Sequence, residues 1–473
     1  MDQTVQAAQE TDSHSHESLA GGTAQSCAQP AGKLGRPKKL RPPPPPLARE
    51  LAVILIHFFP ELAAWLGDVR DPRQSGRATF PLKVLLLLGV LMFLTHTGSR
   101  NHFNDSVRDA IEMAKTLARL MGCAVDAVPH LDTLEKVLRL VSPDTLETLL
   151  AKLIRRLIRM KALDGWRVGG RFLLAIDGTG LYSFRSRHCE HCIETNHSSG
   201  AVTYSHKILV AFIVSADGYA LPMACDFIEN PGEVYVKQDC EIKAFHRLEP
   251  KLKNLYPQTH FWLLLDSLYA DQNVLRACLR NGWNAAITFQ ESDMPALWTE
   301  AQSLLALSPE QKRTITLPNN QGTRELRWIN DLEYEGMNLS AIFQTEKDNS
   351  GAILHFFAHL CCRLIQWGNV EPCAAAARLR WRCENEGFNV LKNGGFALEH
   401  VYSHNPVAAK GYVLLMLIAH IVQQLLTRGR LGTVLKTAFH SFLNYGKKLL
   451  AALSDKPLPP NLDLPGQIRL SIL

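Results

Sequence analysis

Apolar residues follow a helical spacing over residues 47–160, where they recur three or four positions apart. The first stretch is built on Leu51, Ile54, Leu55, Phe58 and Phe59. At residues 142–144 the order Ser-Pro-Asp is typical of a capped helix start, and that helix is expected to run to about residue 160. The pattern therefore predicts a helical N-terminal region.

From residue 169 the pattern changes to short apolar or β-branched runs bounded by turn residues. Strands are predicted over residues 172–176, 207–214, 220–226, 261–265 and 285–289, and helices over residues 237–256 and 272–281. An Asp-Gly-Tyr turn at residues 217–219 is expected to join two of these strands as a hairpin. The alternation predicts an α/β fold with a mixed sheet and flanking helices.

Residues 313–359 return to strand periodicity, which predicts an all-β insertion, and helices follow over residues 378–393, 410–428 and 433–453. The predicted organisation is a disordered basic and Pro-rich arm (1–46), a helical domain for DNA binding or dimerisation (47–165), the first part of the α/β core (166–300), the β-strand insertion (301–370), the C-terminal helices of the core (371–453) and an irregular tail (454–473).

Charge is concentrated near the N-terminus, although the whole 473-residue chain carries only +6. No acidic residue lies between Glu17 and Glu50, and that interval holds Lys33, Arg36, Lys38, Lys39, Arg41 and Arg49. Its segment L-G-R-P-K-K-L-R-P is similar to an AT-hook, which lies in the DNA minor groove. A generic basic tail explains the segment equally well.

Cysteine usage and hydropathy indicate the compartment. Eleven cysteines without a secretory leader predict a reducing, cytoplasmic environment. Residues 82–94 are too few to span a bilayer, and residues 411–426 include His420, Gln423 and Gln424, which are costly in lipid. Both stretches are therefore predicted to be buried core helices, and no membrane partner is expected.

Three carboxylates are the candidate chemistry. Asp177 follows the apolar run F-L-L-A-I and precedes a glycine-rich turn, so it is expected to end a strand. Asp266 ends the run F-W-L-L-L in the same way, and Glu384 lies on a basic helix. Carboxylates at strand ends meet in the crevice above a sheet, and oxygen ligands suit Mg²⁺. The pattern predicts a site for divalent metal.

The order of motifs resembles the DDE transposases of bacterial insertion sequences, in the branch with a β-strand insertion and a Tyr-Arg-Glu-Lys helix. The resemblance covers roughly residues 68–425. It is carried by D-P-R, A-I-D-G-T, H-C-E-H-C, Y-S-H-K, L-L-D-S-L-Y-A, R-W-R-C-E-N-E-G-F-N-V-L-K-N-G-G-F-A-L-E-H and Y-S-H-N. It implies an RNase H-like core that cleaves element ends and joins them to target DNA with Mg²⁺, for which Mn²⁺ substitutes.

The resemblance also implies roles for single residues. Asp177, Asp266 and Glu384 would be the metal-binding triad, and Arg380 precedes Glu384 by the four residues of the family pattern. Two positions depart from that pattern: the lysine should follow the glutamate by seven residues but Lys392 follows by eight, and the tyrosine position holds Ala377. Arg382 and Glu386 repeat the same four-residue relation, so Glu386 stays open as the third carboxylate.

Basic and aromatic side chains are the candidate DNA contacts. Phosphate contacts are expected from Arg36, Lys38, Lys39, Arg380, Arg382 and Lys392. Trp283, Trp298 and Trp381 are candidates for stacking on an unpaired base, and each is also a candidate core residue. The implied partner is double-stranded DNA, both terminal inverted repeats and target, bound by a homodimer or a larger synaptic assembly.

Two further motifs have alternative interpretations. Cys189 and Cys192 have the spacing of half a structural zinc site, with His188, His191, His197 and His206 as further donors, or they are ordinary loop thiols. The run G-T-G-L-Y-S lacks the third glycine of a dinucleotide-binding turn, which disfavours that function. A metal-dependent nuclease without strand transfer and a catalytically decayed, transposase-derived DNA-binding protein are the functional alternatives.

Overall fold

The computed structural model describes residues 46–470 except residues 75, 77, 233 and 433–440. The predicted basic arm, with Arg36, Lys38, Lys39 and the AT-hook-like segment, lies outside the described residues apart from Pro46. The first eight residues of the predicted helix 433–453 also lie outside them.

The N-terminal region is helical, as predicted. Its helices are α1 (Leu47–Phe58), α2 (Leu62–Gly67), α3 (Leu82–Leu94), α4 (Arg100–Val107), α5 (Ile111–Met121), α6 (Leu131–Leu138) and α7 (Pro143–Arg159). Helix α3 is apolar on all sides and buried, because α2, α5, α6 and the C-terminal helix α13 (Pro406–Gln424) pack around it. Ser142 caps α7 by accepting a hydrogen bond from the Asp144 N–H, which confirms the predicted start.

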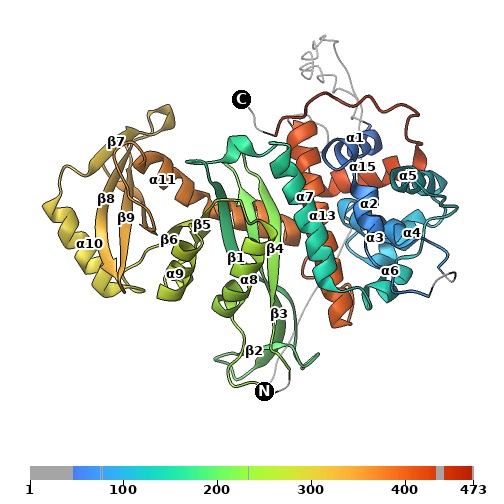
Figure 1. Cartoon of the computed structure of the whole chain (residues 1–473), viewed down its shortest axis with the longest axis horizontal. Helices are drawn as coiled ribbons and strands as arrows, with labels where there is room; N and C mark the ends of the chain where they lie inside the picture. Colours follow the sequence, from blue (N-terminus) through green and yellow to red (C-terminus); the bar gives the residue numbers. More distant parts are fainter. Residues whose placement is uncertain (1–45, 75, 77, 233, 433–440, 471–473) are drawn as a thin grey trace, which may run out of the picture. The chain divides into compact units, whose positions relative to one another are not determined.

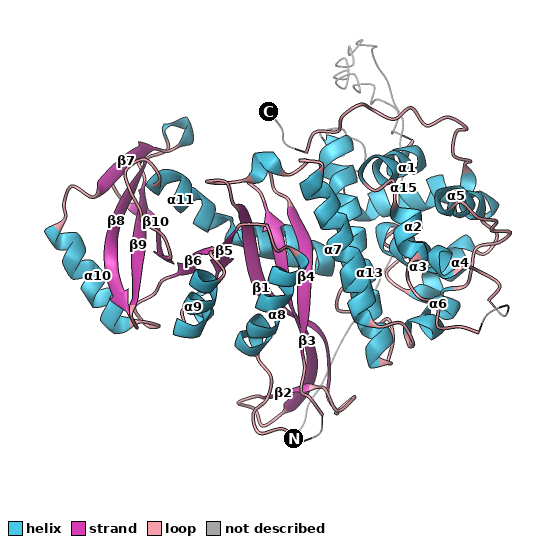
Figure 2. Ribbon diagram, viewed as in Figure 1, coloured by secondary structure: helices cyan, strands magenta, loops and turns pink. Residues whose placement is uncertain are grey.

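A ten-stranded mixed sheet follows (Figures 1 and 2). Its first strands are β1 (Phe172–Phe184), β2 (Ile193–Asn196), β3 (Val202–Val214), β4 (Ala220–Ile228), β5 (Phe261–Leu265) and β6 (Asn284–Thr288), with α8 (Glu241–Leu255) and α9 (Gln272–Arg280) between them. Strand β3 runs antiparallel to both β1 and β4, whereas β5 runs parallel to both β1 and β6. The fold is α/β, and this strand order fits an RNase H-like sheet.

The predicted β-strand insertion extends the same sheet. It consists of β7 (Lys312–Thr316), β8 (Thr323–Tyr334), β9 (Met337–Lys347) and β10 (Ile353–Cys361). Strand β10 pairs antiparallel with β6 through three residue pairs, so the insertion continues the sheet beyond β6. Helix α10 (Pro295–Leu307), which the sequence pattern did not reveal, packs on β8, and α11 (Val370–Ala377) leads back to the core.

Helix α13 (Pro406–Gln424) packs against β4, α7 and α3, so it joins the sheet to the N-terminal helices (Figure 1). Its two glutamines are paired: Gln423 Oε1 lies 2.6 Å from His96 Nε2, and Gln424 accepts from the Ala220 N–H at 2.8 Å and donates to the Ala220 carbonyl at 2.6 Å. Within the described residues, Pro406–Arg430 is long and apolar enough to cross a membrane, and 83% of its most apolar window is buried in the protein. The last helix described is α15 (Phe442–Asp455).

Candidate active site

Asp177 lies within strand β1, not at its end. The sequence predicted that the strand stops at Asp177, and this prediction is wrong: β1 continues to Phe184 because β3 pairs with it as far as that residue. On its other side, β1 pairs with β5 only from Phe172 to Ala175. Beyond Ala175, none of the described strands pairs with that side of β1. Asp177 is the second residue of this unpaired stretch.

Asp266 directly follows β5, as predicted, and accepts a hydrogen bond from the Ser267 N–H at 2.9 Å. Ala175 of β1 is aligned with Leu264 of β5 in the parallel register. Asp177 and Asp266 therefore both lie two residues beyond the last aligned pair, at the carboxyl ends of neighbouring parallel strands.

Arg380 joins both aspartates to Glu384. Its guanidinium lies 3.5 Å from Asp177 Oδ2 and 4.0 Å from Asp266 Oδ1, and it donates to Glu384 Oε1 at 3.0 Å. Only 9% of Arg380 is exposed, so these contacts are poorly screened by water. The structure thus gathers the three predicted carboxylates around one buried positive charge.

Glu386 points elsewhere. Its carboxylate accepts from Arg382 Nη1 at 2.6 Å, and Arg382 Nη2 donates to the Ala216 carbonyl at 3.0 Å, in the turn between β3 and β4. The guanidinium of Arg428 lies against Gly218 in the same turn. Between the two competing glutamates, the geometry places Glu384 with the aspartates and Glu386 with this turn.

The helix that carries Glu384 is irregular. The sequence predicted one regular helix over residues 378–393, whereas the chain forms a 3₁₀ turn (Arg378–Arg380), a π-helical turn (Cys383–Phe388) and the short α12 (Asn389–Asn393). Gly387 packs directly on the Phe212 ring, where a Cβ would lie 3.1 Å from the ring. A π-helical turn holds one residue more than an α-turn, and such turns are frequent at functional sites.

The extra residue in the π-helical turn changes the position of Lys392 around the helix axis relative to Glu384. Eight residues that include a π-turn cover about the same rotation as seven residues of regular α-helix. Lys392 therefore lies roughly 20° from Glu384 around the helix axis, in place of the 80° expected for a regular helix. Its ammonium pairs with Glu399 at 2.8 Å.

Burial sets the protonation of Asp177. It raises the pKa of Asp177 to about 6, against the opposing effect of Arg380, and the nearby carboxylates of Glu241 and Glu384 raise it further. A proton and a cation therefore compete for this carboxylate near neutral pH.

Glu241, which the sequence analysis did not single out, lies beside the triad. A Cβ at residue 178 would lie 2.5 Å from the Glu241 carboxyl, so any larger residue at this position would displace that carboxyl. Tyr269 donates its hydroxyl to Glu241 Oε2 at 3.4 Å, and burial raises the pKa of Glu241. In the sequence, the only hint was an acidic residue near the start of the predicted helix 237–256, a common arrangement without function.

The triad fits a divalent cation by its donor set. Asp177, Asp266 and Glu384 offer oxygen atoms alone, which hard cations such as Mg²⁺ prefer. Arg380 lies between them, with its guanidinium 3.5 Å from Asp177 Oδ2, 4.0 Å from Asp266 Oδ1 and 3.0 Å from Glu384 Oε1. The Arg380 guanidinium therefore supplies positive charge at the point where the three carboxylates come together.

An aromatic cleft of about 620 Å³ opens next to Asp266 and Glu384. Trp298, Phe356 and Trp381 line it, and Trp381 is 51% exposed with the Arg380 guanidinium 5.1 Å from its ring centroid. Trp283 is not part of it: it is 2% exposed and packs against Phe261, so of its two predicted roles the core one is correct.

A second cluster combines His188, Cys189, Cys192 and His206, and one donor atom from each lies within 4.8 Å of the others. This geometry could hold a metal ion. The other two histidines named with this motif have different partners, since His191 binds the Asn230 carbonyl and His197 binds Thr203. Burial raises the pKa of Cys189 to about 11 and lowers that of His206 to about 4.

Comparison with protein-family models and with curated proteins finds no match for this chain. The functional argument therefore depends on the residues and their geometry.

Proposed function

We propose that this protein is a DNA transposase of the DDE type, which cleaves the ends of an insertion sequence and joins them to target DNA. The observation that carries the proposal is the meeting of Asp177, Asp266 and Glu384 around Arg380. These residues come from two neighbouring parallel strands and a helix 118 residues further on, with the β-strand insertion between. The order of these carboxylates and the insertion along the chain, together with a sheet that fits an RNase H-like fold, supports the resemblance to DDE transposases.

Asp177, Asp266 and Glu384 would hold Mg²⁺, or Mn²⁺ in its place. When bound, the metal supplies activation of an attacking oxygen and stabilisation of the leaving oxygen. Arg380 contacts all three carboxylates and offsets one of their negative charges before metal binds. Trp381, half-exposed in the cleft, is placed to stack on an unpaired base, and Arg382 and Lys392 add positive charge along the same helix.

The thiol and imidazole donors of the His/Cys cluster suit zinc, and we assign that second ion a structural role. The partners implied by the transposase function are double-stranded DNA and a second copy of the chain in a synaptic assembly. A bacterial cytoplasmic location follows from the same proposal.

The test is end cleavage and strand transfer on a short model element with Mg²⁺ or Mn²⁺. The DNA that flanks the gene supplies the substrate, since terminal inverted repeats and a short target duplication are expected there. Asp177→Ala and Asp266→Ala are expected to abolish both steps. Retained activity in either variant would falsify the mechanism, cleavage without joined products would indicate a nuclease, and binding without cleavage would indicate a decayed transposase.

A further inference from the structure

The distances in the His/Cys cluster match those of a tetrahedral zinc site. Zinc–sulfur bonds of about 2.3 Å and zinc–nitrogen bonds of about 2.0 Å, at tetrahedral angles, require sulfurs about 3.8 Å apart and sulfur–nitrogen distances of about 3.5 Å. Cys189 Sγ and Cys192 Sγ are 3.8 Å apart, and each lies 3.4 Å from His206 Nε2. Three donors thus already have the spacing that one ion imposes.

His188 supplies the fourth donor. Its Nε2 lies 3.1 Å from His404 Nδ1, which leaves Nδ1 as the other ring nitrogen. That Nδ1 is buried and has no hydrogen-bond partner in the described part of the chain. A buried polar atom without a partner is costly, and an ion in the cluster would satisfy it.

We infer that His188, Cys189, Cys192 and His206 form a Cys₂His₂ zinc site, with His404 as the hydrogen-bond partner that orients the His188 ring. Metal-binding histidines commonly use their second ring nitrogen in this way. His404 directly precedes Asn405, the cap of α13, so the site links the β1–β2 connection to the start of that helix.

The site also braces the segment that leads into α8. Asn230, which is fully buried, donates its side-chain amide to the Cys192 carbonyl at 2.8 Å and its backbone N–H to the His191 carbonyl at 3.1 Å. Gln238 donates to the Glu194 carbonyl at 2.9 Å and accepts from the Glu194 N–H at 2.6 Å. The C-terminal end of the metal-binding loop, residues 191–194, is therefore bonded to Asn230 and Gln238.

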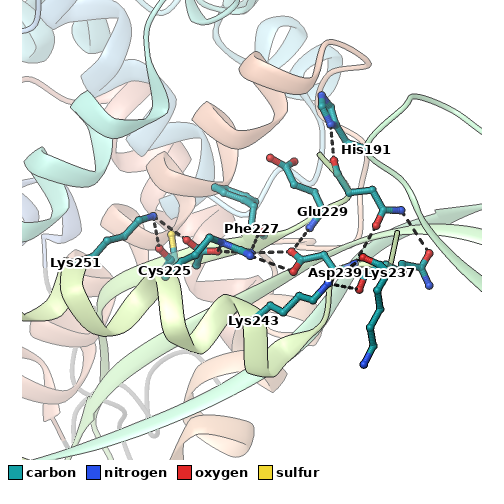
Figure 3. A network of polar contacts seen from close by, with 12 residues as sticks. His191, Cys225, Phe227, Glu229, Lys237, Asp239, Lys243 and Lys251 are labelled. Atoms are coloured by element: carbon teal, nitrogen blue, oxygen red, sulfur yellow. Dashed lines mark hydrogen bonds and ion pairs between the residues drawn. The ribbon is translucent and has the colours of Figure 1, made fainter. Parts of the chain in front are cut away.

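Figure 3 shows this network from His191 at one end to Lys251 on α8 at the other. Asp239, which accepts from Arg247 of α8, receives the Glu229 N–H at 3.0 Å. Cys240 then precedes Glu241, the residue that contacts Gly178 beside Asp177. Zinc would thus fix the connection that delivers the first turn of α8 to the triad. The zinc assignment itself is independent of the proposed transposase function.

The test begins with the metal content of the reduced full-length protein and the absorption spectrum of its Co²⁺-substituted form. The expected result is one zinc per chain and a tetrahedral cobalt spectrum with thiolate-to-cobalt charge transfer. Cys192→Ser and His206→Ala should lose the ion, whereas His197→Ala and Cys240→Ser, which alter a nearby histidine and an exposed thiol outside the cluster, should retain it. His404→Ala should weaken zinc binding roughly 10- to 100-fold.

The assignment is overturned if the reduced wild-type chain takes up neither zinc nor cobalt, or if Cys192→Ser keeps one ion per chain. If the variants fail to fold, alkylation of the wild-type chain tests the zinc site instead. Zinc should protect the thiols of Cys189 and Cys192 from alkylation and leave Cys240 reactive. Hydrogen exchange tests the bracing role, since residues 229–240 should exchange faster after chelation. Unchanged exchange in residues 229–240 would refute the bracing role. None of these measurements uses DNA, so they test the zinc site separately from the transposase function.

Discussion

Arg380 donates to Glu384 across 3.0 Å, one helical turn away, and the same guanidinium reaches both aspartates of the triad. A single buried cation therefore holds the three carboxylates together without metal. The second pair on this helix, Arg382 with Glu386, has the same sequence spacing but a more exposed arginine, 32% against 10% for the two side chains. It supplies a matched control.

Arg380→Gln is expected to destabilise the protein by about 3 kcal/mol without metal, because three partly buried carboxylates lose their counter-charge. Denaturant unfolding in EDTA measures this. Mg²⁺ should restore more stability to the variant than to the wild type, since the cation replaces the missing charge. Arg382→Gln should cost less than about 1 kcal/mol. Equal losses in the two variants would contradict a central role for Arg380.

Glu384→Gln is expected to lower end cleavage by about 10²–10³-fold or more, because it removes one charge that would hold the metal. Glu386→Gln, whose carboxylate faces the β3–β4 turn, should stay within a few-fold of wild type. Single-turnover cleavage at saturating Mg²⁺ separates the two glutamates. The reverse ranking would assign the third carboxylate to Glu386.

The pKa of Asp177, raised by burial to about 6, predicts weaker Mg²⁺ binding as the pH falls through 6, because a proton competes with the cation. Calorimetric titration between pH 5 and 8 measures this affinity. The folding stability of the metal-free protein should instead decrease as the pH rises. A folded pKa above the unfolded value contributes stability below the unfolded pKa, and this is lost as the pH rises through about 6. Asp177→Asn should remove both dependences.

Gly178→Ala is expected to destabilise the protein by about 1–3 kcal/mol, because its Cβ would meet the Glu241 carboxyl at 2.5 Å. Gly180→Ala, in the same strand and with no atom within 4 Å of the added Cβ, is the control and should be nearly neutral. Adding Glu241→Ala to Gly178→Ala should recover part of the loss. A double-mutant cycle from denaturant unfolding gives the coupling, and additive effects would show that the two residues do not compete for space.

Trp381→Ala is expected to weaken binding of a DNA end with an unpaired base by about 1–3 kcal/mol, which is the usual contribution of one stacking contact. Fluorescence anisotropy with a DNA end carrying a single-stranded overhang measures it. Trp367→Ala removes another exposed tryptophan, 59% exposed and outside the cleft, and should leave affinity unchanged. Equal losses in both variants would show that binding is not confined to the cleft.

Local patterns predicted many of the elements, although not α10, and they missed the irregularities within them. The run F-W-L-L-L predicted β5 with its observed bounds, because a strand with parallel neighbours on both sides is apolar throughout. The glycines after Asp177 indicated a turn, yet β1 continues through them. Pairing with β3, a strand more than 20 residues away, outweighs local propensity there.

Long-range contacts were the part that the sequence could not supply. Nothing in the spacing of Glu241 relates it to Gly178, and the choice of His188 and His206 over His191 and His197 depends on how β1, β2 and β3 pair. The π-turn after Glu384 also escaped prediction, since a count of residues assumes a uniform helix.

The link between β6 and β10 consists of the pairs Thr288–His359, Ile287–Leu360 and Ala286–Cys361. Because this pairing hydrogen-bonds the insertion to the sheet that carries the two aspartates, the insertion cannot swing as a hinged lobe without breaking the ladder. A change in the angle between β7–β9 and the strands of the two aspartates would therefore have to twist the common sheet. Force applied to the outer strands would reach the aromatic cleft as twist, because β10 and β6 form two of its walls.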